Sequence, residues 1–138
     1  MDIKKLMAEA VKLSIEHKYT TKPNPVVGAL LYKNGRIVSS GAHEYFGGPH
    51  AEVNCIDKVD SDIKKEDLTL FCTLEPCNHT GKTPPCTDKI ISSGIKKIII
   101  GVVDPNPLVS GQGIKKLKDA GIDVTVGVLP YDQIIGRL

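Results

Sequence analysis

Residues 95–103 constrain the fold of this chain more than any other stretch. They begin with Ile95 and two lysines and continue as a run of isoleucine and valine that only Gly101 interrupts, with no polar alternation. A β-branched run of this kind is typical of a strand buried on both faces, as in sheets that carry helices on both sides. The length of 138 residues favours one domain. The sequence therefore predicts an α/β domain around a covered sheet.

The rest of the chain alternates between helix-like and strand-like segments. Asp2 is placed to cap the first helix, and Asn34-Gly35 is a strong signal for the turn of a hairpin. We expect helices near residues 3–18, 50–58, 86–93 and 113–120, and strands near residues 26–32, 36–40, 68–73, 95–103 and 122–129. This order predicts a three-layer α-β-α fold with a mixed five-stranded sheet.

Two short motifs carry metal-ligand chemistry. They are His50-Ala51-Glu52 and Pro76-Cys77, the second followed by Cys86. One histidine and two cysteines supply the three protein ligands of a catalytic zinc site, in which water keeps the fourth position. Glu52 is placed to act as acid and base toward that water. The pattern is typical of zinc-dependent base deaminases, although their C-x2-C spacing is here C-x8-C.

The position of these motifs relative to the helices limits the geometry of the site. Both motifs fall where we expect helices to start, and a helix N-terminus would favour the thiolate of Cys77. Residues two apart on a helix point about 200° apart. His50 and Glu52 therefore face one metal only if it lies beyond the N-terminal end of their helix.

A structural metal site and disulfides are the alternatives for these residues. A structural zinc site has four protein ligands, and His43 or His79 would supply the fourth. A structural site has no need of a carboxylate at Glu52, which favours the catalytic interpretation. For the cysteines, metal binding is favoured over disulfides in a cytosolic chain. Cys55 and Cys72 lie among apolar residues, and we expect both to be buried.

The charge and hydropathy of the chain limit its expected cellular location and its expected binding partners. The net charge is +2 with two arginines, which is weak for a nucleic-acid-binding protein but compatible with a phosphorylated small molecule. No apolar run approaches the ~20 residues that span a bilayer. The N-terminal segment has no signal-peptide pattern. We therefore expect a cytoplasmic protein that binds neither membranes nor nucleic acid.

Four segments together resemble the deaminase domain of the riboflavin-pathway diaminohydroxyphosphoribosylaminopyrimidine deaminases, and the resemblance covers nearly the whole chain. The segment at residues 73–86, with its C-x8-C spacing, is the most specific of them. The segments read Pro23-Asn24-Pro25-Val26-Val27-Gly28, Gly48-Pro49-His50-Ala51-Glu52-Val53-Asn54, Thr73-Leu74-Glu75-Pro76-Cys77-Asn78-His79-Thr80-Gly81-Lys82-Thr83-Pro84-Pro85-Cys86 and Asp104-Pro105-Asn106-Pro107.

The resemblance implies a cytidine deaminase-like fold, one zinc ion per chain and a homo-oligomer. It implies hydrolytic removal of the 2-amino group of 2,5-diamino-6-(5-phosphoribosylamino)pyrimidin-4(3H)-one. By matching position, the zinc ligands would be His50, Cys77 and Cys86, with Glu52 as the proton shuttle. Substrate contacts would come from Asn24, His43, His79 and Lys82.

Each substrate contact also has a structural alternative. Asn24, between two prolines, equally fits a turn, and His43 in its glycine-rich loop equally fits the surface. His79 and Lys82 lie between the two cysteines, so they must be near the metal if both cysteines bind it. Lys82 would then meet the substrate phosphate.

Two further loops could reach the substrate. Asp104 and Asn106 follow a buried strand, at the end where α/β folds bind ligands, although a plain turn fits them equally well. Gly111-Gln112-Gly113 precedes a helix and is a weak phosphate-binding pattern.

The sequence leaves the functional class with competing interpretations. We expect one zinc-dependent deaminase domain over residues 1–138, without the reductase domain found in many members of the family. A separately encoded reductase is a possible partner. The alternatives are a related deaminase acting on another aminated nucleoside, base or heterocycle, and a structural zinc module or non-catalytic partner subunit.

Overall fold

The computed structural model describes residues 2–15, 27–42, 50–77, 86–103 and 110–128. Within these residues, four helices and five strands follow one another in the predicted order, and a short 3-10 turn, η1, spans Lys65–Asp67. The helices are α1 Ile3–Ile15, α2 Ala51–Lys58, α3 Cys86–Ser93 and α4 Gln112–Asp119. The strands are β1 Gly28–Lys33, β2 Arg36–Ala42, β3 Thr69–Leu74, β4 Lys97–Val102 and β5 Asp123–Val126.

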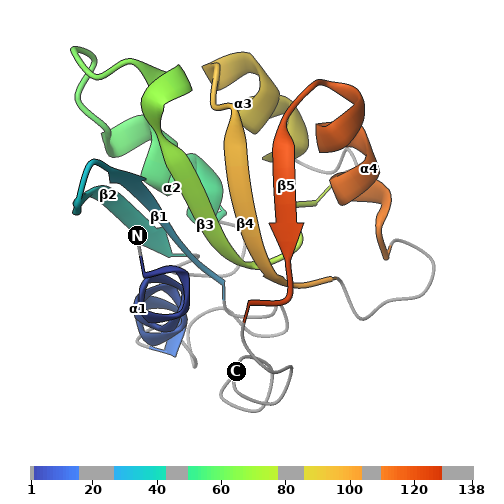
Figure 1. The fold of residues 1–138 in the computed structure, drawn as a ribbon, viewed down its shortest axis with the longest axis horizontal. Coiled ribbons are helices and arrows are strands. Elements are labelled where there is room, and N and C mark those ends of the chain that lie inside the picture. Colours follow the sequence, from blue (N-terminus) through green and yellow to red (C-terminus); the bar gives the residue numbers. More distant parts are fainter. Residues whose placement is uncertain (1, 16–26, 43–49, 78–85, 104–109, 129–138) are drawn as a thin grey trace.

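The strands form one mixed sheet in the order β2-β1-β3-β4-β5 (Figure 1). β1 is antiparallel to β2 and β3, whereas β3, β4 and β5 run parallel. The predicted hairpin is confirmed. Asn34 and Gly35 both have positive φ, 47° and 90°, and Lys33 pairs with Arg36. Positive φ at both turn residues is the geometry that favours Asn-Gly.

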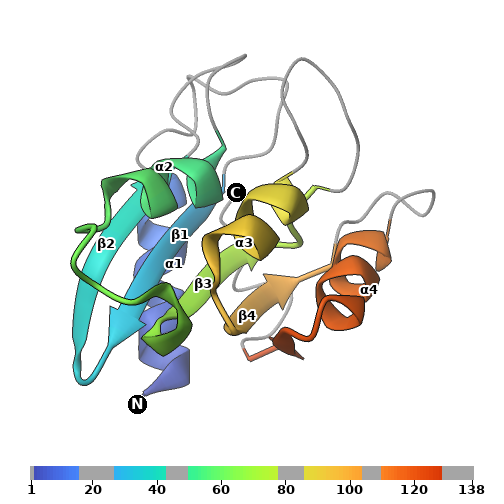
Figure 2. The same ribbon diagram turned by 90° about the horizontal axis from the view of Figure 1, so that it is seen from above.

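Helices cover both faces of the sheet. Figure 2 shows α1 on the face opposite to α2 and α3. The side chains of β4 divide accordingly. Ile98 and Ile100 pack in the cluster that includes residues of α2, α3 and α4, whereas Ile99 packs with residues of α1. All three isoleucines are fully buried. The prediction of a strand buried on both faces is therefore confirmed.

The first helix is capped at its N-terminus and packs closely against the start of β1. The Asp2 carboxylate accepts a hydrogen bond from the Lys5 N–H at 3.1 Å, so the predicted cap is present. α1 extends to Ile15, and the end expected near residue 18 lies outside the described residues. Gly28 starts β1 so close to α1 that a Cβ there would lie 2.0 Å from the Ala10 carbonyl oxygen.

The helices of the described segments are all too short or too polar to traverse a bilayer.

Candidate metal centre

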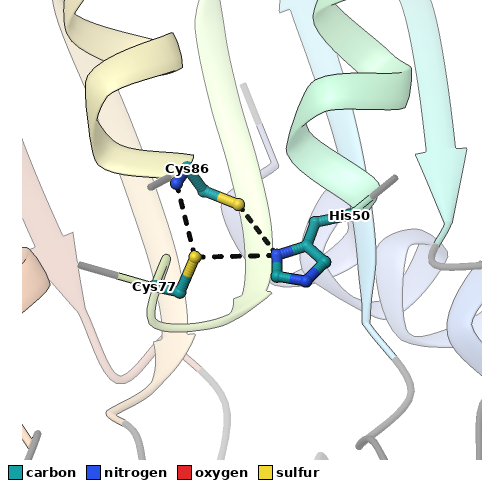
Figure 3. A group of neighbouring side chains, drawn as sticks. All are labelled: His50, Cys77 and Cys86. Carbon is teal, nitrogen blue, oxygen red and sulfur yellow. Dashed lines mark hydrogen bonds between the residues drawn. The ribbon is translucent and has the colours of Figure 1, made fainter. Parts of the chain in front are cut away.

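The side chains of His50, Cys77 and Cys86 meet at one point (Figure 3). His50 is the N-cap of α2, Cys77 lies in the loop after β3, and Cys86 is the first residue of α3. Their ligand atoms all lie within 4.8 Å of one another. The His50 Nδ1 lies 2.9 Å from the Cys86 Sγ and 3.6 Å from the Cys77 Sγ.

This donor set fits zinc. Nitrogen and sulfur ligands at ~2.0 and ~2.3 Å from a tetrahedral zinc are about 3.5 Å apart. The 3.6 Å separation of His50 and Cys77 agrees with that value, and the 2.9 Å contact of His50 with Cys86 is a direct hydrogen-bond distance. The described residues supply three protein ligands, which is the number found in catalytic zinc sites that keep a fourth position for water.

The start of α2 places His50 as the motif requires. His50 has an extended backbone (φ −73°, ψ 163°), and its side chain makes no capping hydrogen bond. Its carbonyl accepts the first bond of the helix from the Asn54 N–H at 3.0 Å. The imidazole is therefore aimed at the two sulfurs beyond the N-terminal end of α2 (Figure 3). This is the placement that the His-x-Glu spacing requires.

The expectation that Cys77 itself starts a helix is wrong. Residues 75–77 form no helix or strand, whereas the helix predicted to open at Cys86 is confirmed. The first turn of α3 nevertheless faces Cys77. The Cys86 N–H donates to the Cys77 Sγ at 3.3 Å, and the Thr87 N–H donates to the Cys77 carbonyl at 3.2 Å. The helix N-terminus thus acts on this thiol from across the loop.

Hydrogen bonds connect the two thiols and the imidazole and shift their pKa values. The hydrogen bond with Cys86 is the largest of the effects that lower the pKa of Cys77 to about 4, and His50 adds to it. The same hydrogen bond, together with burial, raises the pKa of Cys86. The hydrogen bond with Cys77 raises the pKa of His50. Because metal ligands must be deprotonated, zinc binding would release any protons that these groups hold.

Glu52 is buried beside the three ligands. It is the second residue of α2 and is 3% exposed. Burial raises the pKa of its carboxyl, and this effect is only partly opposed by a hydrogen bond with its own backbone, by the nearby His50 and by a hydrogen bond with Cys86. Its Oε2 has no hydrogen-bond partner among the described residues. A buried carboxyl with a raised pKa and a free oxygen is suited to take up and return a proton.

Sequence reasoning missed Glu75, two residues before Cys77. Its carboxylate accepts hydrogen bonds from the Gly111, Gly113 and Ile114 N–H groups at the start of α4. The weak phosphate pattern at Gly111-Gln112-Gly113 is therefore occupied by a carboxylate of the chain itself. The signal was a glutamate at the end of a buried strand, directly before the Pro-Cys motif.

Six predicted substrate contacts lie outside the described residues. The structure therefore leaves their roles untested, and they remain predictions. They are Asn24, His43, His79, Lys82, Asp104 and Asn106.

Comparisons with known proteins agree with this geometry. Residues 1–102 match the family described as the cytidine and deoxycytidylate deaminase zinc-binding region. A protein of Buchnera aphidicola named diaminohydroxyphosphoribosylamino-pyrimidine deaminase is 48% identical over 127 residues, which are 92% of this chain and 85% of the relative. The riboflavin biosynthesis protein RibD of Aquifex aeolicus is 51% identical over 125 residues, which are 91% of this chain.

One of the similar solved structures is a diaminohydroxyphosphoribosylaminopyrimidine deaminase/5-amino-6-(5-phosphoribosylamino)uracil reductase from Thermotoga maritima. It is 46% identical with a TM-score of 0.84, and the match covers 94% of this chain and 37% of that one. The fold is therefore cytidine deaminase-like, as expected from the sequence. The chain spans 35% of the length of the Aquifex RibD protein.

Proposed function

Since the chain belongs to the zinc-binding family of cytidine and deoxycytidylate deaminases, and within it to the riboflavin-pathway deaminases, we propose that it deaminates a pyrimidine by hydrolysis. The proposed substrate is 2,5-diamino-6-(5-phosphoribosylamino)pyrimidin-4(3H)-one. The products are 5-amino-6-(5-phosphoribosylamino)uracil and ammonia. The name of the Buchnera relative, which this chain matches over most of its length, supports this choice.

The observation that carries the proposal is the buried Glu52 beside the metal ligands. Its Oε2, which has no hydrogen-bond partner in the part of the chain that the structure describes, belongs to a carboxyl that is otherwise enclosed by protein. A structural zinc site would need a fourth protein ligand and no such carboxyl. Burying a polar atom without a partner costs free energy unless a bound molecule satisfies it. A water or substrate atom held next to the zinc is the partner that fits.

His50, Cys77 and Cys86 would hold the zinc, and bound zinc would supply a Lewis acid that polarises a water molecule. Glu52 takes a proton from that water at Oε2 as the water oxygen bonds to the ring carbon that carries the amine. Glu52 then gives this proton to the adjacent ring nitrogen, takes the remaining proton from the newly added hydroxyl group and passes it to the departing amine. Ammonia leaves and a carbonyl remains, so one carboxyl serves as base and acid in turn.

Ammonia release from the phosphorylated diaminopyrimidine tests this proposal. Glu52→Gln should keep one zinc per chain and lower the rate by about 10²- to 10⁴-fold, the usual contribution of a general acid–base group. Glu66→Gln is the matched control, because Glu66 is an exposed glutamate in η1. It should match the wild type.

Two outcomes would contradict the proposal. No ammonia from zinc-loaded wild type would reject this substrate and direct the search to other aminated heterocycles. Ammonia release that survives Glu52→Gln would reject the role of Glu52. Failure on every aminopyrimidine would favour a structural module or a partner subunit.

The finer expectations remain proposals of the same kind. We propose substrate contacts through Asn24, His43, His79, Lys82, Asp104 and Asn106, in a homo-oligomer in the cytoplasm. We also propose that residues 1–138 act as one deaminase domain, with the subsequent reduction carried out by a separately encoded enzyme.

A further inference from the structure

We propose that Glu75 is a positioning residue for the metal centre, which fixes the Cys77 ligand by anchoring its loop to the N-terminus of α4. Glu75 is not among the three candidate metal ligands of the described residues. The inference rests on the zinc site of the proposed function, but not on the identity of the substrate. Its support comes from the contacts made by three consecutive residues, Glu75, Pro76 and Cys77.

The side chain of Glu75 is fully engaged with α4. Its Oε1 accepts a hydrogen bond from the Gly111 N–H at 2.9 Å, and its Oε2 accepts from the Gly113 and Ile114 N–H groups at 2.9 and 3.2 Å. Glu75 is 5% exposed. Hydrogen bonds from N–H groups to a carboxylate are stronger than neutral ones, and a helix N-terminus favours negative charge. The contact between this loop and α4 is therefore strongly directional.

Gly113 brings the helix against the backbone of the same loop. A Cβ at Gly113 would lie 2.3 Å from the Pro76 carbonyl oxygen and 3.3 Å from the Glu75 Oε2. Side-chain atoms larger than hydrogen would push α4 and the loop apart. The glycine thus permits the close approach that the three hydrogen bonds require.

The backbone on either side of Pro76 is held as well. The Glu75 N–H donates to the Val102 carbonyl at the end of β4 at 2.9 Å, and the Cys77 carbonyl accepts from the Thr87 N–H at 3.2 Å. Pro76 between them has a fixed φ. The backbone that leads to Cys77 is therefore short and stiff, and the Glu75 carboxylate holds its N-terminal end in place.

A helix cap that contributes only stability is the simpler alternative. Both roles would lower the melting temperature when Glu75 is changed. Only a positioning role would change the coordination of the metal, because only then does the loop move the Cys77 sulfur. Residues that orient metal ligands typically cost 10- to 100-fold in metal affinity when changed.

The test measures zinc affinity by competition with a chromophoric chelator, and the visible spectrum of the cobalt-substituted protein, which reports thiolate ligation. Glu75→Gln keeps the shape of the side chain but removes its charge, and should weaken zinc binding by about 10-fold or more. Gly113→Ala leaves Glu75 intact but pushes α4 away, and should do the same. Both should alter the cobalt–thiolate bands.

Leu117→Val is the matched control. Leu117 lies on the same helix and is fully buried in the core, so the change loosens α4 without touching Glu75. It should lower the melting temperature and leave zinc affinity and the cobalt spectrum at wild-type values. If Glu75→Gln behaves as this control does, Glu75 is only a cap and the proposal is overturned. Neither readout uses substrate, so a failed deamination assay cannot be confused with this result.

Discussion

The two sides of the metal centre are held in place by different physical means. One side is α2, which carries His50 and Glu52 and packs against the edge strand β2. The other side is the Cys77 loop together with the first turn of α3 at Cys86. The α2 side is fixed by close packing and neutral hydrogen bonds, whereas the cysteine side depends on a carboxylate at a helix N-terminus.

Contacts of α2 with β2 show the first kind of support. The Ser39 hydroxyl donates to the Cys55 carbonyl at 2.6 Å, and the Asn54 side-chain amide donates to the Ala42 carbonyl at 2.8 Å. Gly41 lies so close to α2 that a Cβ would be 2.7 Å from the Cys55 nitrogen and 2.8 Å from the Ala51 oxygen. Close packing of α2 against β2 therefore fixes the positions of His50 and Glu52.

Shifts of the two sides of the metal centre should therefore affect different measurable quantities. Small shifts of α2 move Glu52 as well as a ligand, so they should affect the rate of proton transfer along with metal binding. Shifts of the cysteine loop move a thiolate only, so they should affect metal binding first. Three substitutions, taken in order of expected effect, test this division.

Removal of a thiolate should have the largest effect. Cys77→Ser should weaken zinc binding by more than the roughly 10- to 100-fold that loss of an outer contact costs, because a ligand is lost. Cys55→Ala is the matched control, since burial raises the pKa of the Cys55 thiol to about 12 and keeps it protonated in the core. Chelator competition measures both. Equal affinities of the two variants would contradict the assignment of the cysteine side.

Crowding of the α2 side should have an intermediate effect. Gly41→Ala should lower the free energy of unfolding by about 1–3 kcal/mol, as overpacking usually does, and should lower ammonia release by displacing Glu52. Gly35→Ala is the control, because Gly35 has positive φ but nothing within 4 Å of its Cβ position. It should cost about 1 kcal/mol through strain alone and leave the rate per folded molecule unchanged. A Gly41→Ala enzyme with wild-type turnover would break the comparison.

Loss of an exposed ion pair between the two sides should have the smallest effect. Lys89 of α3 lies 2.7 Å from Asp57 of α2, with both side chains more than a third exposed. Lys89→Met should lower the free energy of unfolding by less than about 1 kcal/mol, and by less still in high salt. Lys118→Met, at an exposed position on α4, is the control for loss of charge. A change in zinc affinity with Lys89→Met would mean that this pair couples the two sides.

Local signals in the sequence predicted much of the fold. Asn34-Gly35 predicted the hairpin, Asp2 the first cap, and the isoleucines of β4 a strand covered on both faces. The spacing of His50 and Glu52 predicted where a metal must lie relative to α2. These features depend on backbone geometry within a few residues, so they can be read from the sequence alone.

Contacts between distant residues could not be predicted in this way. The Glu75 carboxylate meets Gly111, which is 36 residues further along the chain, and no local pattern pairs them. The start of α3 at Cys86 was predicted, but its contact with Cys77 was not, because the hydrogen bond from the Cys86 N–H crosses a nine-residue separation. The order of the strands in the sheet likewise depends on pairing across the whole domain.

Three glycines limit which mutations this protein can tolerate. They are Gly28, Gly41 and Gly113. A methyl group at these positions would lie 2.0, 2.7 and 2.3 Å from backbone atoms of Ala10, Cys55 and Pro76. None of the three has a reactive side chain, yet most single-nucleotide changes in their codons would introduce a side chain that does not fit. Mutations at these glycines would therefore disturb the packing of α1, α2 and α4 without altering any reactive side chain.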